Sequence, residues 1–329
     1  MSMNPGDPNS FNHRTERLST GRTYHFVDQR PAHYTAETPT LLCLHGFPDL
    51  WYGWRHQIGP WVRRGYRVIA PDMLGYGGTD KPTAPEEYSM KRLSDDMAAL
   101  LDIVGVRKAV VIGHDWGSYT AGRFALWHPD RLRALAMLSV PYNPPIPVYL
   151  SLPEIVKRLP NLGYQLYLAS DASTKEVEAN LDRFLRLMYS LVTPDKNMLL
   201  EGKLRQVLFH AEGQAPAKKL LLNEKMSNMN GPLSYYRTTK ARFDEEKAAR
   251  LAPSLPASLP VLHIYGSRDK TTAASAAEAS RQLIPRLELV ELDGVGHWVM
   301  LQAKEEITEA VGGWLERVGV VPAKAHGKL

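Results

Sequence analysis

Short apolar runs alternate with longer segments of helical periodicity along most of this chain. The apolar runs predict strands over residues 40–45, 66–72, 108–113, 132–140, 259–266 and 287–294. Apolar positions recur at helical spacing over residues 54–65, 90–104, 116–127 and 305–318, and an alanine-rich helix is expected after residue 266. This alternation predicts an α/β fold with a mostly parallel sheet and helices on both faces.

The alternation stops at Pro141 and resumes after Arg250. Between these two residues we find helical patterns without strand patterns, and residues 176–190 and 233–250 each predict one helix. Prolines cluster at both ends of the segment, as is typical of domain boundaries. We therefore expect an α/β core made of residues 1–140 and 251–329, with an all-helical cap inserted at residues 141–250.

The segment VVIGHDWGSYTAG, residues 110–122, predicts a strand, a tight turn and a helix of small residues. In hydrolases with this turn the central residue is a serine nucleophile, whereas this chain has Asp115. Gly113 and Gly117 suit a turn so sharp that side chains would clash there. Alternatively, Asp115 only caps the helix that follows, since aspartate is common at that position.

A carboxylate at the turn indicates attack on a saturated carbon. The product is an alkyl ester, whose carbonyl water can attack to regenerate the enzyme; a serine would instead form an inert ether. The N-terminus of the following helix favours the ionised form of Asp115. The leaving group would be the oxygen of an epoxide or a halide.

Ester hydrolysis requires a general base and an acid that orients it. His297 follows the last predicted strand and Asp269 follows the strand before it, giving the chain order nucleophile, acid, base. Of the other histidines, we expect His114 to position the turn, His45 to hydrogen-bond to the backbone and His210 to lie on the surface.

The hydrolysis of an ester passes through an oxyanion. The backbone N–H groups of Phe47 and Trp116 are the expected donors to it, because they follow the first core strand and the nucleophile. The Phe47–Pro48 bond lies in a tight turn and is a candidate for the cis form.

Four segments, HGFPDLWYGWRHQ, GHDWGSY, YGSRDK and GVGHW, together resemble the epoxide hydrolases of the α/β-hydrolase superfamily. The resemblance implies that two cap tyrosines bind and protonate the epoxide oxygen, and it places them at Tyr164 and Tyr236. Tyr235 stands where the family often has tryptophan, and only one of these adjacent tyrosines can face the site.

The resemblance also implies the reaction. Asp115 opens the epoxide, Tyr164 and Tyr236 donate to its oxygen, and His297 activates water to release a vicinal diol. Phe47, Trp116 and the two tyrosines would bind the substrate, and no metal or organic cofactor would take part. The chain resembles soluble epoxide hydrolases without an N-terminal phosphatase domain.

Two other functions remain open at this stage. A haloalkane or fluoroacetate dehalogenase would use the same aspartate and histidine, but the usual second halide donor is an asparagine where this chain has Phe47. Fluoroacetate dehalogenases have arginine where it has Trp116. A ligand-binding protein on the hydrolase fold would be expected to have lost parts of the Asp–His–Asp set, and all three are present.

The composition adds little that is specific. The 329 residues include 40 basic and 35 acidic side chains, with no block of like charge, so we expect a small-molecule epoxide as partner, and neither nucleic acid nor membrane. The single cysteine, Cys43, is expected to be a buried thiol. Without a signal sequence we expect a cytoplasmic monomer or homodimer; the C-terminal Gly-Lys-Leu differs by one residue from a peroxisomal signal.

Overall fold

The structure is a computed structural model, and it describes residues 3–189, 196–210, 228–271 and 274–322. Its strands form one sheet in the order β1-β2-β4-β3-β5-β6-β7-β8. The strands are β1 (His13–Arg17), β2 (Thr23–Gln29), β3 (Thr40–Leu44), β4 (Arg67–Pro71), β5 (Ala109–His114), β6 (Leu132–Leu138), β7 (Val261–Gly266) and β8 (Leu287–Leu292). The strands from β4 to β8 along this order are parallel, and β1 and β2 are antiparallel to their neighbours.

The sequence patterns predicted the parallel strands but not the two antiparallel ones. β1 forms the edge of the sheet and contains no fully buried residue, so it lacks the apolar alternation that marks a half-buried strand. β2 buries Tyr24, Phe26 and Val27, but its polar neighbours hide the pattern. The prediction of a mostly parallel α/β sheet is confirmed, with this N-terminal addition.

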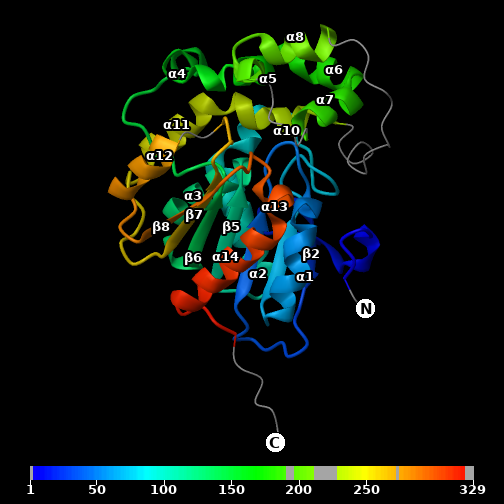
Figure 1. The fold of residues 1–329 in the computed structure, drawn as a ribbon, viewed down its shortest axis with the longest axis vertical. Helices are drawn as coiled ribbons and strands as arrows, with labels where there is room; N and C mark the ends of the chain where they lie inside the picture. The colour runs from blue at the N-terminus through cyan, green and yellow to red at the C-terminus, as the bar shows by residue number, and fades with distance from the viewer. Residues whose placement is uncertain (1–2, 190–195, 211–227, 272–273, 323–329) are drawn as a thin grey trace, which may run out of the picture.

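Helices cover both faces of the sheet (Figure 1). The helices of the part that surrounds the sheet are α1 (Arg55–Arg63), α2 (Met90–Ile103), α3 (Trp116–Trp127), α12 (Ala274–Ala279), α13 (Val299–Gln302) and α14 (Lys304–Arg317). Alternate residues of a strand point to opposite faces. Accordingly Leu41 and Cys43 pack with Trp61 and Trp314 of α1 and α14, whereas Leu42 packs on the opposite face with α2 and α3. Cys43 is fully buried, as predicted.

The described residues between β6 and β7 form helices and turns, and several of these helices lie above the carboxyl edge of the sheet (Figure 1). They are α4 (Leu152–Arg158), α5 (Tyr164–Ala169), α6 (Asp171–Ala179), α7 (Leu181–Met188), α8 (Lys203–His210), α10 (Asn230–Ser234) and α11 (Thr239–Ala248). None of the helices in the described ranges is long and apolar enough to cross a bilayer. The division into core and cap at Pro141 and Arg250 stays a prediction.

Two expected long helices in this segment are interrupted, so these predictions were wrong. Residues 176–190 do not form one helix: α6 ends and α7 begins at Asn180, whose backbone is not helical and whose side chain donates to the Glu176 carbonyl. Residues 233–250 are divided between α10, a 3₁₀ turn over Tyr235–Arg237, and α11. Asparagine favours such breaks because its amide competes for backbone partners. Ser190, the side chain of His210 and the C-terminal Gly-Lys-Leu lie outside the described residues.

Candidate active site

Asp115 lies in the sharp turn between β5 and α3, at the carboxyl edge of the sheet. Its backbone has φ 54° and ψ −119°, a conformation that costs a non-glycine residue about 1–3 kcal/mol. The glycines on either side permit the turn, because a Cβ on Gly113 would lie 2.2 Å from the Gly117 carbonyl oxygen and one on Gly117 would lie 2.1 Å from that of Leu44. The turn is therefore as sharp as the flanking glycines predicted, and it also packs against the end of β3.

The register of the sheet brings Phe47 to Asp115. Leu44 at the end of β3 lies opposite Gly113 in β5, so the loops after both strands leave the sheet side by side. The Phe47 backbone N–H donates to Asp115 Oδ1 at 2.8 Å. The Phe47–Pro48 bond is cis, as its position in a tight turn suggested.

The pKa of the Asp115 carboxyl is raised above its ordinary value. Burial is the largest cause, and the charge of His297 and the N–H groups of Phe47 and Trp116 only partly oppose it. The N–H group of Trp116 at the helix N-terminus thus lowers the pKa of Asp115, as expected, but by less than burial raises it. The ionised form of Asp115 depends on its histidine neighbour as well as on the backbone donors.

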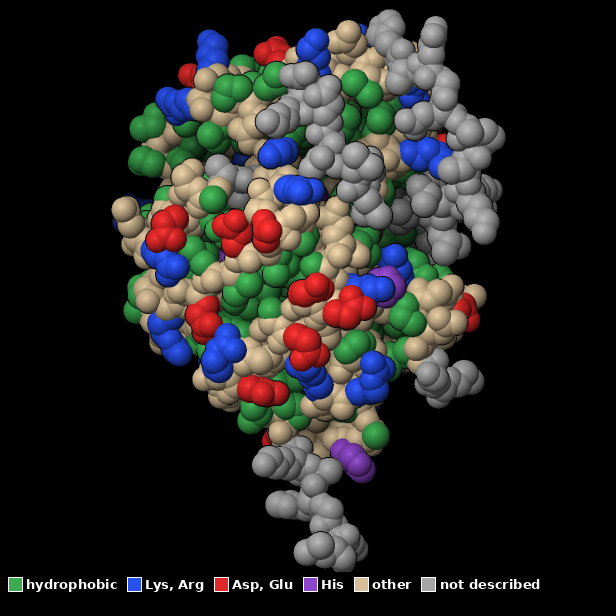
Figure 2. All heavy atoms as spheres, viewed as in Figure 1, with side chains coloured by type: hydrophobic (Ala, Val, Ile, Leu, Met, Phe, Trp, Pro, Cys, Tyr) green, Lys and Arg blue, Asp and Glu red, His purple; other side chains and the backbone are tan. Residues whose placement is uncertain are grey.

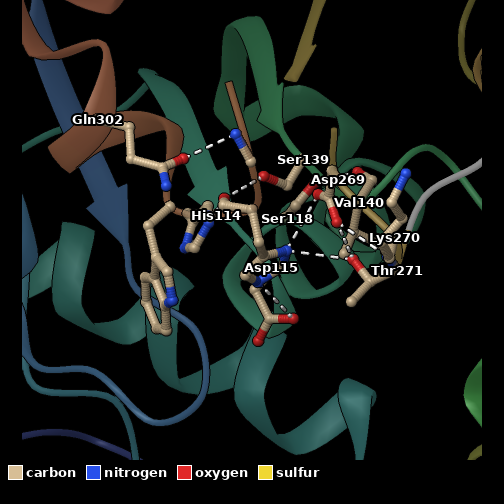
Figure 3. Close-up of polar contacts among 12 residues, drawn as sticks. His114, Asp115, Ser118, Ser139, Val140, Asp269, Lys270, Thr271 and Gln302 are labelled. Carbon is tan, nitrogen blue, oxygen red and sulfur yellow. Dashed lines mark hydrogen bonds and ion pairs between the residues drawn. The ribbon is translucent and has the colours of Figure 1, made fainter. Parts of the chain in front are cut away.

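His297 and Asp269 lie in adjacent loops at the same edge, because β7 and β8 are paired up to Gly266 and Leu292. His297 Nε2 lies 3.6 Å from Asp115 Oδ2, and its Nδ1 lies 3.0 Å from Asp269 Oδ2. The structure therefore brings together the three residues that the sequence placed in the order nucleophile, acid, base. Figure 3 shows Asp115 and Asp269 converging on this centre.

The charges of the three residues depend on one another. Burial lowers the pKa of His297, but the carboxylates of Asp269 and Asp115 outweigh it and raise that pKa to about 9. Burial raises the pKa of Asp269, but His297 and Thr271 outweigh it and lower that pKa to about 2. His297 is therefore an imidazolium between two carboxylates at neutral pH.

Thr271 is a member of this arrangement that sequence reasoning missed. Its backbone N–H and hydroxyl both contact Asp269 Oδ1, at 2.9 and 2.7 Å, and the hydroxyl oxygen lies 3.1 Å from His297 Nδ1 (Figure 3). A threonine after the acid carries no signal that would distinguish it from any loop threonine. It fixes the plane of the Asp269 carboxylate.

The loop that carries His297 is held from the sheet side. His114 Nε2 donates to the His297 carbonyl at 2.9 Å, and the Ser139 hydroxyl donates to the same oxygen at 2.7 Å. Gln302 accepts from the Gly296 N–H at 2.7 Å (Figure 3). Burial lowers the pKa of His114 to about 3, so it is neutral and acts as a structural donor. His45 contacts the backbone at Gly46 and Met73, as expected.

Two cavities meet beside Asp115. The first chamber, about 230 Å³, is lined by Phe47, Leu187, Met188 and Trp298 among others. The second chamber, about 400 Å³, is lined mainly by apolar residues of the segment 140–162 and by α11. Asp115, Tyr164, Tyr236 and Thr271 line both chambers. Cavities of this size accommodate small organic molecules.

The two expected tyrosines face this junction from the helices above the sheet. Tyr164 begins α5, and its ring centroid lies 6.4 Å from that of Tyr236. Tyr236 also makes edge contacts with Phe47 and Trp116, both at 5.1 Å. Its neighbour Tyr235 points elsewhere and donates its hydroxyl to the Leu74 carbonyl, which confirms that one of the pair faces the site. Burial raises the pKa of Tyr164 and of Tyr236, so both phenols keep their protons.

A second missed feature joins the Phe47 loop to the helices. The hydroxyl oxygen of Tyr189, at the end of α7, lies 2.6 Å from Pro48 O and 2.9 Å from Asp49 Oδ1, within hydrogen-bond distance of both. Its ring stacks on Trp298 at 4.3 Å. Burial raises the pKa of Asp49 to about 7. Asp49 stands in the HGFPD segment, but nothing in the sequence indicated its partner.

Comparison with known proteins identifies the family to which this fold belongs. Residues 39–304 match the family described as alpha/beta hydrolase fold. The chain is 32% identical over 293 residues to epoxide hydrolase A of Mycobacterium tuberculosis, which covers 83% of this chain and 89% of that protein. Among solved structures it is similar to epoxide hydrolase A of Mycobacterium thermoresistibile, with a TM-score of 0.79, 29% identity and coverage of 93% and 98% of the two chains.

A second relative is longer than this chain. Bifunctional epoxide hydrolase 2 of Rattus norvegicus is 29% identical over 325 residues, which cover 95% of this chain and 57% of the rat protein. The chain thus spans little more than half the length of that relative. The bacterial relative matches over most of its own length. The sharp turn with Asp115 lies between β5 and α3, at the carboxyl edge of the sheet. The chain therefore belongs to the alpha/beta hydrolase fold family and, within it, to the epoxide hydrolases.

Proposed function

We propose that this protein hydrolyses epoxides to vicinal diols through an ester formed on Asp115. The observation that carries the proposal is the junction of the two chambers, where a carboxylate, a histidine bound to a second carboxylate, and two protonated phenols line one space. The names of the relatives support the same activity. The substrate is a small molecule, and its epoxide lies between Asp115 and the pair Tyr164 and Tyr236.

The first step forms the ester. The Asp115 carboxylate attacks one carbon of the epoxide, a carbon–oxygen bond of the ring breaks, and the ring oxygen takes a proton from a tyrosine hydroxyl. A ring-opened oxygen is a poor leaving group without a proton, so a phenol that is protonated and close by lowers this barrier. Tyr164 and Tyr236 are in that state because burial disfavours their phenolates.

The second step hydrolyses the ester and uses the change in charge that the first step makes. The alkylated Asp115 has lost its negative charge, and with it one cause of the raised pKa of His297. The imidazolium of His297 then gives up its proton, which returns through solvent to the tyrosinate left by the first step. Neutral His297 next takes a proton from water as the water attacks the Asp115 carbonyl carbon. The N–H groups of Phe47 and Trp116 donate to the oxyanion. When the ester carbon–oxygen bond breaks, the departing diol oxygen takes the proton of the added hydroxyl, and Asp115 is again a carboxylate. Asp269 and Thr271 keep the imidazole oriented.

The dehalogenase alternative has less support. A halide site needs N–H donors that are free to turn to the halide, and the two indoles lining the chambers are those of Trp116 and Trp298. The Trp298 indole already donates to the Met188 carbonyl at 2.6 Å. No other residue that lines the two described chambers supplies an indole.

The setting in which the reaction takes place is inferred from the same features. The residues 141–250 form the cap that supplies both tyrosines, and the remainder forms the core. The single cysteine, buried in β3, supports a reducing compartment, the cytoplasm. Acidic and basic side chains are interspersed on the face seen in Figure 2, which supports a small-molecule partner rather than nucleic acid. The expectations of a monomer or homodimer and of catalysis without a cofactor stay predictions.

The test is a paired assay of purified protein with styrene oxide and with a chloroalkane. Formation of the diol without release of chloride is the expected result. Chloride release with a rate comparable to diol formation would replace the proposal with dehalogenation. Absence of both products across a panel of epoxides and chloroalkanes would indicate a binding protein.

A further inference from the structure

Three arginines line the second chamber. Arg158 is exposed, whereas Arg123 and Arg242 lie deeper and differ in their partners. Arg123 is almost fully buried and every donor group is occupied: Nε and Nη2 face Glu246, Nη1 donates to the Asn143 carbonyl, and Nη2 donates to the Tyr119 hydroxyl at 2.7 Å. Among the described residues that line the chamber, Glu246 is the one acidic side chain besides Asp115, and it pairs with Arg123. Arg123 is therefore a structural cation.

Arg242 lines the same chamber from α11 and has no such partners. Its Nη1 is shielded from solvent and has no hydrogen-bond acceptor among the described residues, and Glu246, one turn further along the helix, is bound to Arg123. The guanidinium lies over the rings of Tyr119 and Trp116, with its Cζ 4.8 and 6.0 Å from their centroids. The rings orient the cation but accept few of its N–H hydrogen bonds.

An unpartnered guanidinium is unusual in this position. Most buried polar atoms find a partner, and a shielded N–H without one loses the hydrogen bonds it would make in water. A planar guanidinium matches a carboxylate, which can accept two parallel N–H bonds. The chamber thus contains a cation whose missing partner would be an anion.

The remainder of the second chamber is mainly apolar, which restricts the kind of anion. Its lining includes Pro144, Ile146, Leu150, Leu152, Ile155, Leu159, Leu162 and Phe243. Ile146 and Leu159 line the chamber and are also exposed to solvent, so the apolar surface extends to the outside of the molecule. A free inorganic anion would leave this surface uncovered. An alkyl chain ending in a carboxylate would cover it and reach Arg242.

The path from Arg242 to the reacting residues is short and continuous. The Trp116 ring contacts both the Arg242 guanidinium and the Tyr236 ring, and the centroids of the two rings lie 5.1 Å apart. Trp116 follows Asp115 in the chain, and all four residues line the second chamber. We propose that Arg242 binds a carboxylate at the end of an apolar arm of the substrate, while the epoxide of the same molecule lies at Asp115. This inference rests on the proposed function and makes the substrate class an epoxide whose apolar arm ends in a carboxylate.

Matched substrate pairs test the proposal. The substrates are straight-chain terminal epoxides of increasing length that end either in a carboxylate or in its methyl ester, and the quantity compared is the ratio of kcat/KM for acid to that for ester. Loss of a charge-assisted pair is worth about 10- to 100-fold, so Arg242→Gln should lower this ratio by that factor for chain lengths that reach the guanidinium. Arg242→Lys keeps the charge but not the planar fork and should give an intermediate ratio.

Lys247→Gln is the control, since Lys247 is an exposed cation on the same helix that does not line the chamber. It removes the same charge and should leave the ratio within about twofold, as exposed charges have small effects. Thermal unfolding checks that each variant is folded. An unchanged ratio in folded Arg242→Gln, or an equal fall in Lys247→Gln, would overturn the proposal.

A binding measurement separates this inference from the proposed function. Calorimetry with decanoate and with decan-1-ol needs no turnover. Decanoate should bind wild type more tightly than decanol, and Arg242→Gln should remove the difference. Decanoate binding that depends on Arg242 in a protein that hydrolyses no epoxide would support the carboxylate site and refute the reaction. Turnover of neutral epoxides without any carboxylate preference would refute the carboxylate site alone.

Discussion

The carboxyl edge of the sheet and the helices that follow β6 line the same two chambers but hold their residues differently. At the edge, Asp115, His297 and Asp269 are joined by hydrogen bonds and ion contacts of 2.7–3.6 Å that involve backbone and side chains of four loops. In the helices, Tyr164 and Tyr236 are placed mainly by ring contacts of 5.1–6.4 Å. The edge therefore has one geometry suited to making and breaking an ester, whereas the helices supply donors and shape the chambers for the substrate.

The largest expected effect comes from the edge. His297→Gln should stop ester hydrolysis but allow its formation, because the base acts only in the second step. We expect a burst in which each enzyme molecule consumes one equivalent of epoxide, and a stable alkyl ester on Asp115 that mass spectrometry detects. The steady-state rate of diol formation should be lower by about 10²–10⁴-fold. His33→Gln, which changes an exposed histidine, is the control. Unreduced steady-state turnover in His297→Gln would show that another group is the base.

The next effect comes from the helices. Tyr164→Phe and Tyr236→Phe each remove one of two donors to the ring oxygen, and each should lower kcat by about 10- to 100-fold, with a larger loss in the double variant. Tyr235→Phe is the matched control, because its hydroxyl bonds to Leu74 rather than facing the chambers. If Tyr235→Phe lost as much activity as Tyr236→Phe, the loss would reflect packing of the helices rather than proton donation.

The sequence was sufficient to predict which residues meet at the carboxyl edge of the sheet, but not where the helices after β6 begin and end. Asp115, Asp269 and His297 each follow a strand of the sheet. Strands of a parallel sheet bring their carboxyl ends together, so chain order alone predicted their meeting. Asn180 breaks a helix whose apolar spacing continues through it, and periodicity does not register such a break. Asp49 was missed because its partner Tyr189 is distant in the chain. Thr271 was missed because only its place between Asp269 and His297 distinguishes it from other loop threonines. Arg242 was missed because the sequence does not reveal that its Nη1 lacks an acceptor.

Stability should depend on pH through the edge. The pKa of His297 is raised from 6.5 to about 9 on folding, so its protonated form stabilises the folded state. That contribution is complete below pH 6.5 and is lost as the pH rises to about 9. The free energy of unfolding should fall by up to about 3 kcal/mol over this interval, measured by urea denaturation. The fall should be absent in His297→Gln; its persistence there would assign it to other groups.

The smallest effect concerns Thr271, which touches the acid rather than the substrate. Thr271→Val removes the hydroxyl that contacts Asp269 and His297 while keeping the shape of the side chain. We expect a fall in kcat of about five- to tenfold and a shift in the pH profile of kcat, since a neutral hydrogen bond is worth about 1 kcal/mol. Thr271→Ser should restore both. If Thr271→Ser restored neither kcat nor its pH profile, the loss would be due to the methyl group, and hence to packing.

The central claim is that the Asp115 carboxylate is alkylated and then freed by water that attacks its own carbonyl carbon. The most direct measurement is a single turnover in heavy-oxygen water with enzyme in excess over styrene oxide, followed by mass spectrometry of the peptide that contains Asp115. The account predicts one heavy oxygen in the Asp115 carboxylate and none in the newly formed diol. Heavy oxygen in the diol, with an unlabelled Asp115, would show that water opens the epoxide directly and would contradict the account.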